Sequence, residues 1–325
     1  MTKKDAGYAP APPADFILPF DLPGIGLRGR IARLDEASSR ALIAHPLPEA
    51  AQCLLAEALI LSTLLGSALK LEGRLSVQLK GDGPLSLLVA DYFAGGGLRG
   101  YARFDESRLN DFPADAAFSE LAGEGALAIT IEPKLGAQAY QGLVPLSPEG
   151  LARSAEGYFD QSEQLPTLIK LSAGPIYRAG EENGWRAGGI MVQAVPEKIA
   201  GEITEADDWQ RVQMFLETLE PFELLDTDVS AESVLWRLFH EDEVRVQPSR
   251  VLKFQCTCHE GKVRSVLSSY PEDALAELAE KDRIVRTRCE FCGEAYVFPL
   301  EELAMNPKTQ KQTQKQAEEQ TPIQS

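Results

Sequence analysis

Apolar residues recur at the spacing of an α-helix in one long stretch in the first quarter of the chain. From about Pro48 to Leu69, leucine and alanine return every three or four residues and so line one face of a helix. The residues of this stripe are Leu54, Leu55, Ala58, Leu61, Leu65 and Leu69. Glycine beyond the last periodic residue is a common helix stop, so the pattern predicts a long helix closed by Gly73.

Shorter stretches with alternating apolar and polar residues surround this helix. In residues 74–80, for example, Leu75, Val77 and Leu79 lie on one face of a predicted strand. Glycine-rich turns join this strand to the next two, which is typical of an antiparallel meander. Strands are predicted at 29–34, 74–80, 85–93, 98–104, 126–131, 140–145, 166–171 and 185–195, and a second helix near 148–164. Together they predict an α+β core domain with a mixed or antiparallel sheet over residues 15–195.

After Pro196 the apolar stripes are combined with many acidic residues. Between 196 and 243 the Asp and Glu residues are opposed only by Lys198, Arg211 and Arg237. Two helices are still predicted, with stripes at Trp209, Val212, Phe215, Leu216 and Leu219, and at Val234, Leu235, Leu238 and Phe239. Short helices with many like charges are marginal alone. Residues 196–253 are therefore predicted to form an acidic, metastable helical linker, although an ordinary acidic helical pair with a solvated outer face would give the same pattern.

The remaining segments have compositions of their own. Residues 1–14 are rich in Ala and Pro and predict a flexible N-terminal arm, and residues 306–325, rich in Lys, Gln and Thr, predict a disordered tail. Residues 254–305 hold four cysteines and predict a small compact module. We find no run that approaches the roughly 20 apolar residues of a membrane span and no apolar segment of signal-peptide type, so a cytoplasmic location is expected.

Charge narrows the choice of partners. The chain has 32 Lys and Arg residues against 49 Asp and Glu residues, a net charge of −17. Such a surface repels phosphate backbones and anionic lipids, so neither nucleic acid nor membrane is an expected partner, although solubility alone would explain the same charge. In the reducing cytoplasm, five cysteines favour metal or redox chemistry over structural disulfides.

Four of these cysteines have the spacing of a metal site. Cys256 and Cys258 form a C-x-C pair, and Cys289 and Cys292 form a C-x-x-C pair. Four thiolates suit one tetrahedral Zn²⁺ and close its coordination, which argues against a zinc hydrolase. His259 follows the first pair without the spacing of a nucleobase deaminase and is expected at the surface. The alternative is a zinc ribbon with a purely structural role.

Two features favour a redox-sensitive site over a structural one. A single residue between Cys256 and Cys258 allows their sulfurs to bond to each other once the metal is lost. Basic residues that would favour reactive thiolates lie nearby in sequence, at Lys253, Lys262, Arg264, Arg286 and Arg288. The apolar residues between the pairs are few, namely Val263, Val266, Leu267, Leu275, Leu278, Ile284 and Val285. Loss of the metal should therefore unfold the module.

Other candidate sites are weaker. Cys53 lies within the predicted apolar helix and is expected to be a buried, inert thiol. Residues 24–29 match G-x-G-x-x-G, but no strand precedes them and a strand-like segment follows, so no nucleotide site is expected. Neither a phosphate-binding loop of the G-x-x-x-x-G-K-[ST] type nor a Ser/His/Asp set is found, so no catalytic residues are assigned.

The chain resembles the 33 kDa heat-shock chaperonin family, the redox-regulated bacterial holdases. The cysteine motif is the most specific part of the resemblance, since Tyr296-Val297-Phe298 follows Cys292 at the family's spacing. The N-terminal part agrees in Gly73-Arg74-Leu75-Ser76-Val77-Gln78, Gly81-Asp82-Gly83-Pro84, Leu98-Arg99-Gly100-Tyr101, Tyr140-Gln141-Gly142, Tyr158-Phe159, Ser162-Glu163-Gln164, Gly188-Gly189, Gln193 and Pro196. The Ala/Pro-rich start, the stretch around Arg178–Trp185 and the tail depart from it.

The resemblance implies an ATP-independent chaperone. In the reduced form Cys256, Cys258, Cys289 and Cys292 would hold one Zn²⁺ per chain, and the protein would be inactive. Oxidation would form the disulfides Cys256–Cys258 and Cys289–Cys292, release zinc and unfold the module and the linker. The active form would dimerise, bind unfolding client proteins and later pass them to ATP-dependent foldases.

Two other function classes compete with this interpretation. A constitutive zinc-ribbon adaptor would bind its partner in the reduced, zinc-loaded form, whereas the chaperone would act only after oxidation. An enzyme using the N-terminal α+β domain is disfavoured by the scarcity of histidine and the lack of a nucleophile–base motif.

Overall fold

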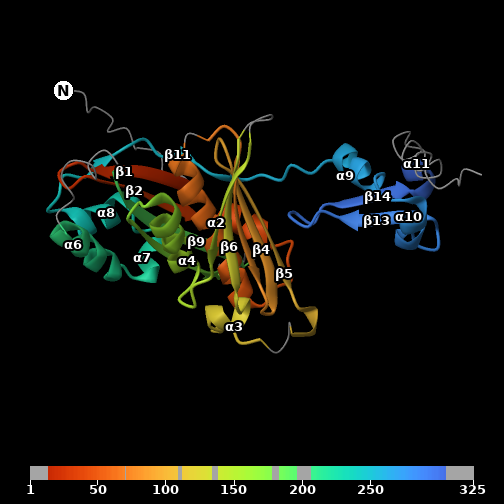
Figure 1. The fold of residues 1–325 in the computed structure, drawn as a ribbon, viewed down its shortest axis with the longest axis horizontal. Coiled ribbons are helices and arrows are strands. Elements are labelled where there is room, and N and C mark those ends of the chain that lie inside the picture. The colour runs from red at the N-terminus through yellow and green to blue at the C-terminus, as the bar shows by residue number, and fades with distance from the viewer. Residues whose placement is uncertain are drawn as a thin grey trace, which may run out of the picture. The chain divides into compact units, whose positions relative to one another are not determined.

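The computed structural model describes residues 14–69, 71–108, 112–133, 138–177, 183–195 and 206–304. They belong to two compact units, Met1–Gln255 and Cys256–Ser325, which are described separately (Figure 1). The predicted arm up to residue 13, the start of the predicted linker at 196–205 and the predicted tail at 306–325 lie outside the described residues.

Two sheets form the frame of the first unit. The first has the order β10-β1-β2-β9-β8 with β11 also paired to β1, and the second has the order β12-β5-β4-β3-β6-β7. All their pairings are antiparallel except that of β12 with β5, which confirms the predicted mixed or antiparallel α+β fold. The strands are β1 (Phe16–Leu22), β2 (Leu27–Leu34), β3 (Arg74–Gly81), β4 (Leu85–Phe93), β5 (Gly97–Phe104), β6 (Gly125–Glu132), β7 (Tyr140–Pro145), β8 (Thr167–Ile176), β9 (Gly184–Ala194), β10 (Arg245–Val246), β11 (Arg250–Val251) and β12 (Lys253–Phe254).

Helix α2 (Glu49–Ala68) packs between these two sheets (Figure 1). The prediction of this helix is confirmed, but it ends at Ala68, because Leu69 is already extended, and not close to Gly73. Contrary to the expectation from sequence, α2 is long and apolar enough to cross a membrane. Since 83% of its apolar window is buried inside the protein, it is the core helix of this unit.

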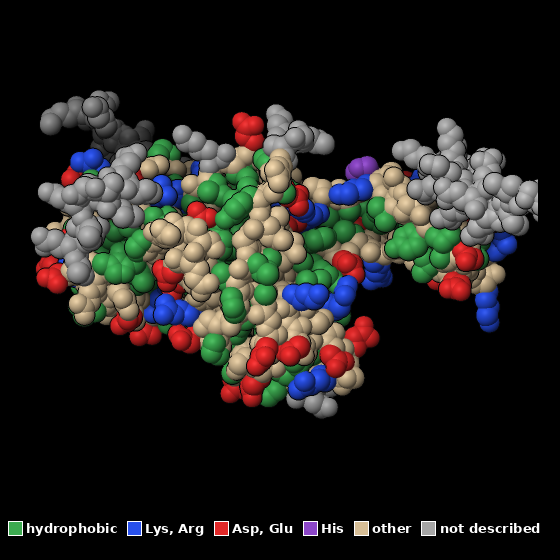
Figure 2. Space-filling model, in the orientation of Figure 1, with side chains coloured by type: hydrophobic (Ala, Val, Ile, Leu, Met, Phe, Trp, Pro, Cys, Tyr) green, Lys and Arg blue, Asp and Glu red, His purple; other side chains and the backbone are tan. Residues whose placement is uncertain are grey.

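Three acidic helices cover the opposite face of the first sheet: α6 (Ala206–Glu217), α7 (Pro221–Leu225) and α8 (Ala231–Phe239) (Figure 1). Their apolar stripes pack against side chains of β1, β2 and β9, including Phe20, Ile31 and Ile190. Figure 2 shows acidic side chains on the outer surface of this region. The segment predicted as a metastable linker is thus docked on the sheet in this structure, and the predicted domain boundaries stay predictions.

Cationic side chains from the first sheet hold the ends of these helices. Arg33 donates to the carbonyl oxygens of Leu224 at 2.9 Å and Val229 at 3.0 Å, and Lys170 donates to that of Leu216 at 3.1 Å. Carbonyl groups at a helix C-terminus carry partial negative charge and lack partners within the helix. The helices are therefore fixed to the sheet by polar contacts as well as apolar ones.

The second unit is small. Strands β13 (Ile284–Arg288) and β14 (Ala295–Pro299) form a hairpin, accompanied by α9 (Glu260–Leu267), α10 (Glu272–Leu278) and α11 (Leu300–Ala304). Its buried apolar cluster consists of Leu267, Leu275, Val285, Phe298, Leu300 and Leu303. Val266 and Leu278, predicted as part of this core, are about half exposed, at 54% and 51%.

Several elements were not predicted. The sequence of β1 does not alternate because both of its faces are buried, and Pro19 further obscures the strand signal. Strands β10, β11 and β12 have two residues each, too short for any periodicity. The predicted helix at 148–164 is shorter, consisting of α4 (Leu151–Tyr158) and a π-helical turn, η2 (Phe159–Glu163). The remaining short helices are α1 (Glu36–Leu42), η1 (Glu106–Arg108) and α3 (Phe118–Ala122).

Candidate metal centre

The second unit brings the four predicted cysteines together. The Sγ atoms of Cys256, Cys258, Cys289 and Cys292 all lie within 4.8 Å of one another. The Cys256–Cys289 sulfurs are 3.6 Å apart and the Cys258–Cys292 sulfurs 3.3 Å apart. Sulfurs bound tetrahedrally to one Zn²⁺ at about 2.3 Å would be separated by roughly 3.8 Å. The residues therefore fit a closed zinc site, and all four thiols are free.

The first pair lies between a strand and a helix. Strand β12 ends at Phe254, and the backbone N–H of Gln255 donates to the Leu98 carbonyl at 2.7 Å, just before Cys256. Beyond Cys258, the exposed His259 is the N-cap of α9, and its Nδ1 accepts from the Lys262 N–H at 3.2 Å. His259 is therefore used to start a helix at the surface, as expected.

The second pair lies in the turn of the β13–β14 hairpin. The N–H of Cys289 donates to the Glu294 carbonyl at 2.9 Å, and the N–H of Gly293 donates to the Cys289 carbonyl at 2.8 Å. Gly293 has a φ of 72°, a left-handed conformation that favours glycine. This tight turn points two sulfurs spaced C-x-x-C to one side, toward the sulfurs of the first pair.

A tyrosine next to the site was not identified as part of it from the sequence. The Tyr296 hydroxyl hydrogen-bonds the sulfur of Cys258, which raises the pKa of the tyrosine. Burial raises the pKa of Cys258, but the hydrogen bonds from Tyr296 and the neighbouring cysteines outweigh it, so the pKa is lowered overall. Burial dominates at Cys256 and Cys292, whose pKa values are raised. Tyr296 was singled out only as part of the Tyr-x-Phe motif.

Arg264 and Arg286, two of the basic residues predicted to favour thiolates, form ion pairs with carboxylates. Arg264 pairs with Glu302 at 2.6 Å and with Glu260 at 2.7 Å. Arg286 pairs with Glu280 at 2.7 Å and Asp282 at 2.8 Å. Their charge is therefore largely neutralised by carboxylates, and the prediction that these two arginines activate the sulfurs is not supported by the structure.

The weaker candidates have structural explanations. Cys53 is half-buried in α2, and burial, followed by Glu57 and Glu49, raises its pKa to about 12, as expected for an inert thiol. The glycine motif at 24–29 forms the turn between β1 and β2 and enters β2, without the helix a nucleotide site needs. Gly29 leaves room for the ring of Phe20 and not for a phosphate, and any side chain at position 29 would overlap that ring.

Comparisons with known proteins find similar sequences over most of the chain. A sequence model of the family described as Hsp33 protein matches residues 15–299. The 33 kDa chaperonin of Caulobacter vibrioides is 40% identical over 292 residues, which cover 87% of this chain and 94% of that protein. The 33 kDa chaperonin of Cronobacter sakazakii is 37% identical over 279 residues, covering 86% and 90%.

A solved structure has a similar fold. The crystal structure of the 33 kDa chaperonin from Thermotoga maritima matches with a TM-score of 0.76 and covers 92% of this chain and 99% of that chain. Its sequence identity is 23%, so this likeness bears on the fold alone.

Proposed function

The chain belongs to the Hsp33 protein family, and we propose that Cys256, Cys258, Cys289 and Cys292 are the ligands of its zinc and the sulfurs of its redox switch. The protein is a redox-regulated chaperone, a holdase for unfolding proteins and not an enzyme. Its four-cysteine cluster is typical of the family's zinc site. The convergence of the four sulfurs within 4.8 Å carries the proposal.

The proposed oxidation joins the cysteines within each pair. Cys256 and Cys258 together lose two electrons and form one S–S bond, and Cys289 and Cys292 do the same. For each bond, one molecule of hydrogen peroxide takes up two electrons and two protons and becomes two water molecules. Disulfide sulfurs are poor metal ligands, so the oxidised cysteines would no longer hold zinc. In the folded unit, the sulfur distances of 3.3 Å and 3.6 Å join Cys258 to Cys292 and Cys256 to Cys289, and so join different pairs. Partners within a pair stay close in an unfolded chain because the loop between them is very short.

Metal loss unfolds the second unit because its own core is small. Six buried apolar side chains form that core. Zinc binding in small cysteine sites contributes roughly 10–16 kcal/mol at neutral pH, which exceeds what a core of this size supplies. Oxidation is thereby converted into a large conformational change.

Unfolding then spreads to the acidic helices through the chain that precedes Cys256. Strands β10, β11 and β12 each make only a two-residue pairing with β1 or β5. Pairings this short have low local stability. Once they separate, α6, α7 and α8 keep only their contacts with the first sheet.

Release of these helices uncovers apolar surface. The contact between sheet and helices buries Phe20, Leu22 and Ile31 on the sheet side. It also buries Leu235 and Phe239 on the side of α8. Unfolding proteins expose apolar segments that would bind such surfaces, whereas the acidic outer faces keep the chaperone soluble. We further propose that the active form is a homodimer in the cytoplasm that passes clients to ATP-dependent foldases, as the family resemblance implies.

The proposal is tested by adding peroxide at heat-shock temperature to the reduced, zinc-loaded protein. Zinc release, measured with a chelating dye, should coincide with suppressed aggregation of a thermolabile client. A constitutive adaptor would keep its zinc and would bind its partner before oxidation. Zinc retention with unaltered client aggregation would remove the redox switch, and mass spectrometry of the oxidised form would identify the disulfide pairs.

A further inference from the structure

A cavity of about 600 Å³ lies at the C-terminal end of α2, in the first unit and away from the cysteines. Residues from both sheets, α2, α4 and η2 line it, among them Arg28, Leu65, Leu75, Ile131, Tyr158 and Glu163. Its volume lies in the range of small-molecule sites, and its wall is mainly apolar with a few polar groups, as in such sites. The redox switch makes no use of these residues.

The polar groups include an arginine in an unusual position. Leu27 and Ile31 of β2 point to the acidic helices, so Arg28 and Arg30 lie on the opposite face, on the side of α2. The Nε atoms of both arginines are buried and have no hydrogen-bond partner in the part of the chain that the structure describes. An unpaired buried cationic donor is costly, so its retention needs a reason.

A third arginine adds to this positive charge. Arg250 donates to the Ser67 carbonyl at 3.2 Å, near the end of α2. Burial, together with repulsion from Arg28 and Arg250, lowers the pKa of Arg30 to about 10. The Asp21 carboxylate, on the cross-strand neighbour of Arg28, opposes this shift, but three guanidinium groups near one carboxylate still favour an added anion here.

The tyrosines, Glu163 and Gln193 of the cavity form hydrogen bonds that do not involve Arg28. The Tyr158 hydroxyl donates to Oε1 of Glu163 at 2.6 Å, and the Tyr140 hydroxyl approaches the same atom at 3.4 Å. Gln193 of β9 is the cross-strand neighbour of Arg28 of β2, and its side-chain amide donates to the Thr167 hydroxyl at 3.1 Å. The only carboxylate lining the cavity is thus bound by two tyrosines, and no ion pair joins it to Arg28 among the described residues.

The wall next to Glu163 has an irregular backbone. Residues Phe159–Glu163 form a single π-helical turn, and Gln164 follows with a φ of 51°, which non-glycine residues rarely adopt. Turns of this kind occur frequently at functional sites. Here the turn brings Phe159, Glu163 and Gln164 to one side of the cavity.

We propose that this cavity binds a small organic monoanion with an apolar body, of the class of medium-chain carboxylates. The carboxylate accepts hydrogen bonds from Arg28, and the chain lies against Leu65, Leu75 and Ile131. One guanidinium lines the cavity beside one carboxylate, Glu163, so a single negative charge fits and a dianion would be repelled.

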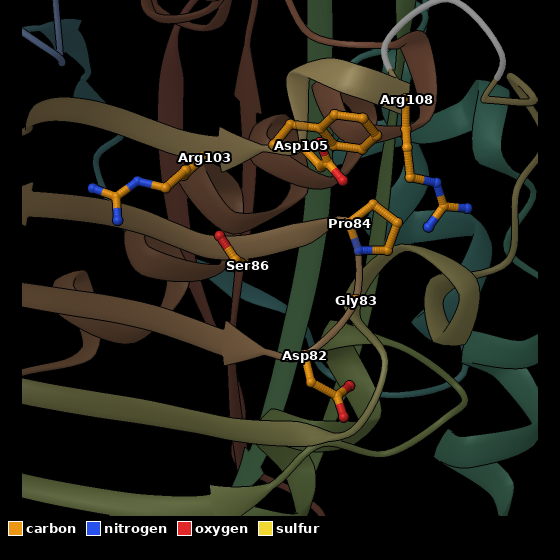
Figure 3. A pocket seen from close by; sticks show the side chains of 8 residues that line it. Asp82, Gly83, Pro84, Ser86, Arg103, Asp105 and Arg108 are labelled. Atoms are coloured by element: carbon orange, nitrogen blue, oxygen red, sulfur yellow. The ribbon is translucent and has the colours of Figure 1, made fainter.

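A second hollow shows the contrast (Figure 3). It is lined by Asp82, Ser86, Arg103 and Asp105, among others. Its charged groups already have partners, since Asp82 accepts from the Glu124 N–H and Asp105 accepts from Ser107. Among its described residues it has no buried unpaired donor and no apolar wall comparable to that of the cavity beside α2. Arg103 therefore provides a matched control.

The test uses the reduced, zinc-loaded full chain and isothermal titration with three probes. Octanoate has the head group and the apolar body, acetate has only the head group, and 1-octanol has only the body. Octanoate should bind with a stoichiometry of one, at least about tenfold more tightly than either other probe. Equal binding of octanoate and 1-octanol, or several equivalent sites, would indicate unspecific adsorption and overturn the proposal.

Variants locate the site. Arg28→Gln should weaken octanoate binding by about tenfold or more without affecting 1-octanol, and its melting temperature should be unchanged or higher because an unpaired buried charge is removed. Arg103→Gln should bind octanoate normally. Ile131→Phe fills the cavity while keeping Arg28, and so tests the site independently of the folding of the Arg28 variant. Unaltered octanoate binding in Arg28→Gln or in Ile131→Phe would refute the assignment.

Discussion

The apolar cluster around α2 and the apolar cluster of the cysteine unit differ greatly in extent. The first runs from Ile17 to Leu252, includes most of α2 and is enclosed by two sheets. The second has six buried side chains beside a four-sulfur centre. A large enclosed core is stable without a metal, whereas a small one needs help. On the proposed mechanism, this difference would let a redox switch act in the second unit while the α+β core around α2 keeps its fold.

The acidic helices fall between these two extremes. They share a sizeable apolar cluster with the first sheet, but they form short segments and carry many like charges. Intermediate stability of their docking would suit the proposed role, in which the helices are docked in the reduced state and released in the oxidised one.

The largest effect is expected at the cysteine centre. Cys289→Ser removes one of four thiolates and should lower the apparent zinc affinity by several orders of magnitude, since the complete site contributes roughly 10–16 kcal/mol. Limited proteolysis should then cut within 256–304 while the fragment 14–195 resists. The control is Cys53→Ser, which should change neither zinc content nor cleavage. Unchanged zinc affinity in Cys289→Ser would contradict the ligand assignment.

A buried aromatic side chain tests the docking of the acidic helices. Phe239 of α8 is fully buried against the first sheet and stacks on Phe20, with ring centroids 6.0 Å apart. Phe239→Ala should cost about 3–5 kcal/mol and lower the oxidant or heat needed for activation without loss of zinc from the reduced protein. Hydrogen exchange of residues 206–239 measures the change.

The control for that variant lies on the same helix. Trp236 is 69% exposed, so Trp236→Ala should change stability by about 0.5 kcal/mol or less. If both variants behaved alike, the burial of α8 would not determine the activation threshold.

A polar contact should have a smaller effect. Arg33→Met removes the hydrogen bonds to the Leu224 and Val229 carbonyls and should loosen α7 by about 1–3 kcal/mol. Hydrogen exchange within 221–229 should increase more than in the rest of the unit. Arg245→Met, which removes an exposed pair with Glu243, is the control and should have almost no effect. Equal protection of 221–229 in both variants would exclude an anchoring role for Arg33.

The smallest predicted effect concerns α2 and depends on pH. Burial raises the pKa of Glu57 from 4.5 to about 7, so the folded state favours its protonated form. The resulting stability is complete below the pKa of the unfolded chain and is lost as pH rises through about 7. Glu57→Gln should therefore stabilise the protein by about 1–2 kcal/mol at pH 8 and have little effect near pH 5.

Urea unfolding at the two pH values measures this effect. Glu149, which lines the same small cavity as Glu57, is exposed and lies 3.8 Å from Arg153. Glu149→Gln should not change the pH dependence of stability. A gain in the Glu57 variant that was equal at both pH values would show that the charge of Glu57 is not its cause.

Local patterns predicted much of the secondary structure. The stripe of α2 and the alternation of β3 were readable because one period continues over several turns or residues. The paired spacing of the cysteines predicted the metal centre for a similar reason, since ligand spacing within a pair is a local property. Strand β1 was missed because burial on both faces removes alternation, and Tyr296 was missed because its partner, Cys258, is distant in sequence.

The sequence by itself determined that four cysteines would form one closed centre, that the core is α+β, and that the chain belongs with redox-regulated holdases. Tertiary structure decided which surfaces meet. It placed the acidic helices on the first sheet, engaged Arg264 and Arg286 with carboxylates, and left the Nε of Arg28 without a hydrogen-bond partner among the described residues, beside a cavity. The reason is physical: spacing and periodicity are set by neighbours along the chain, whereas burial and pairing depend on residues that only the fold brings together.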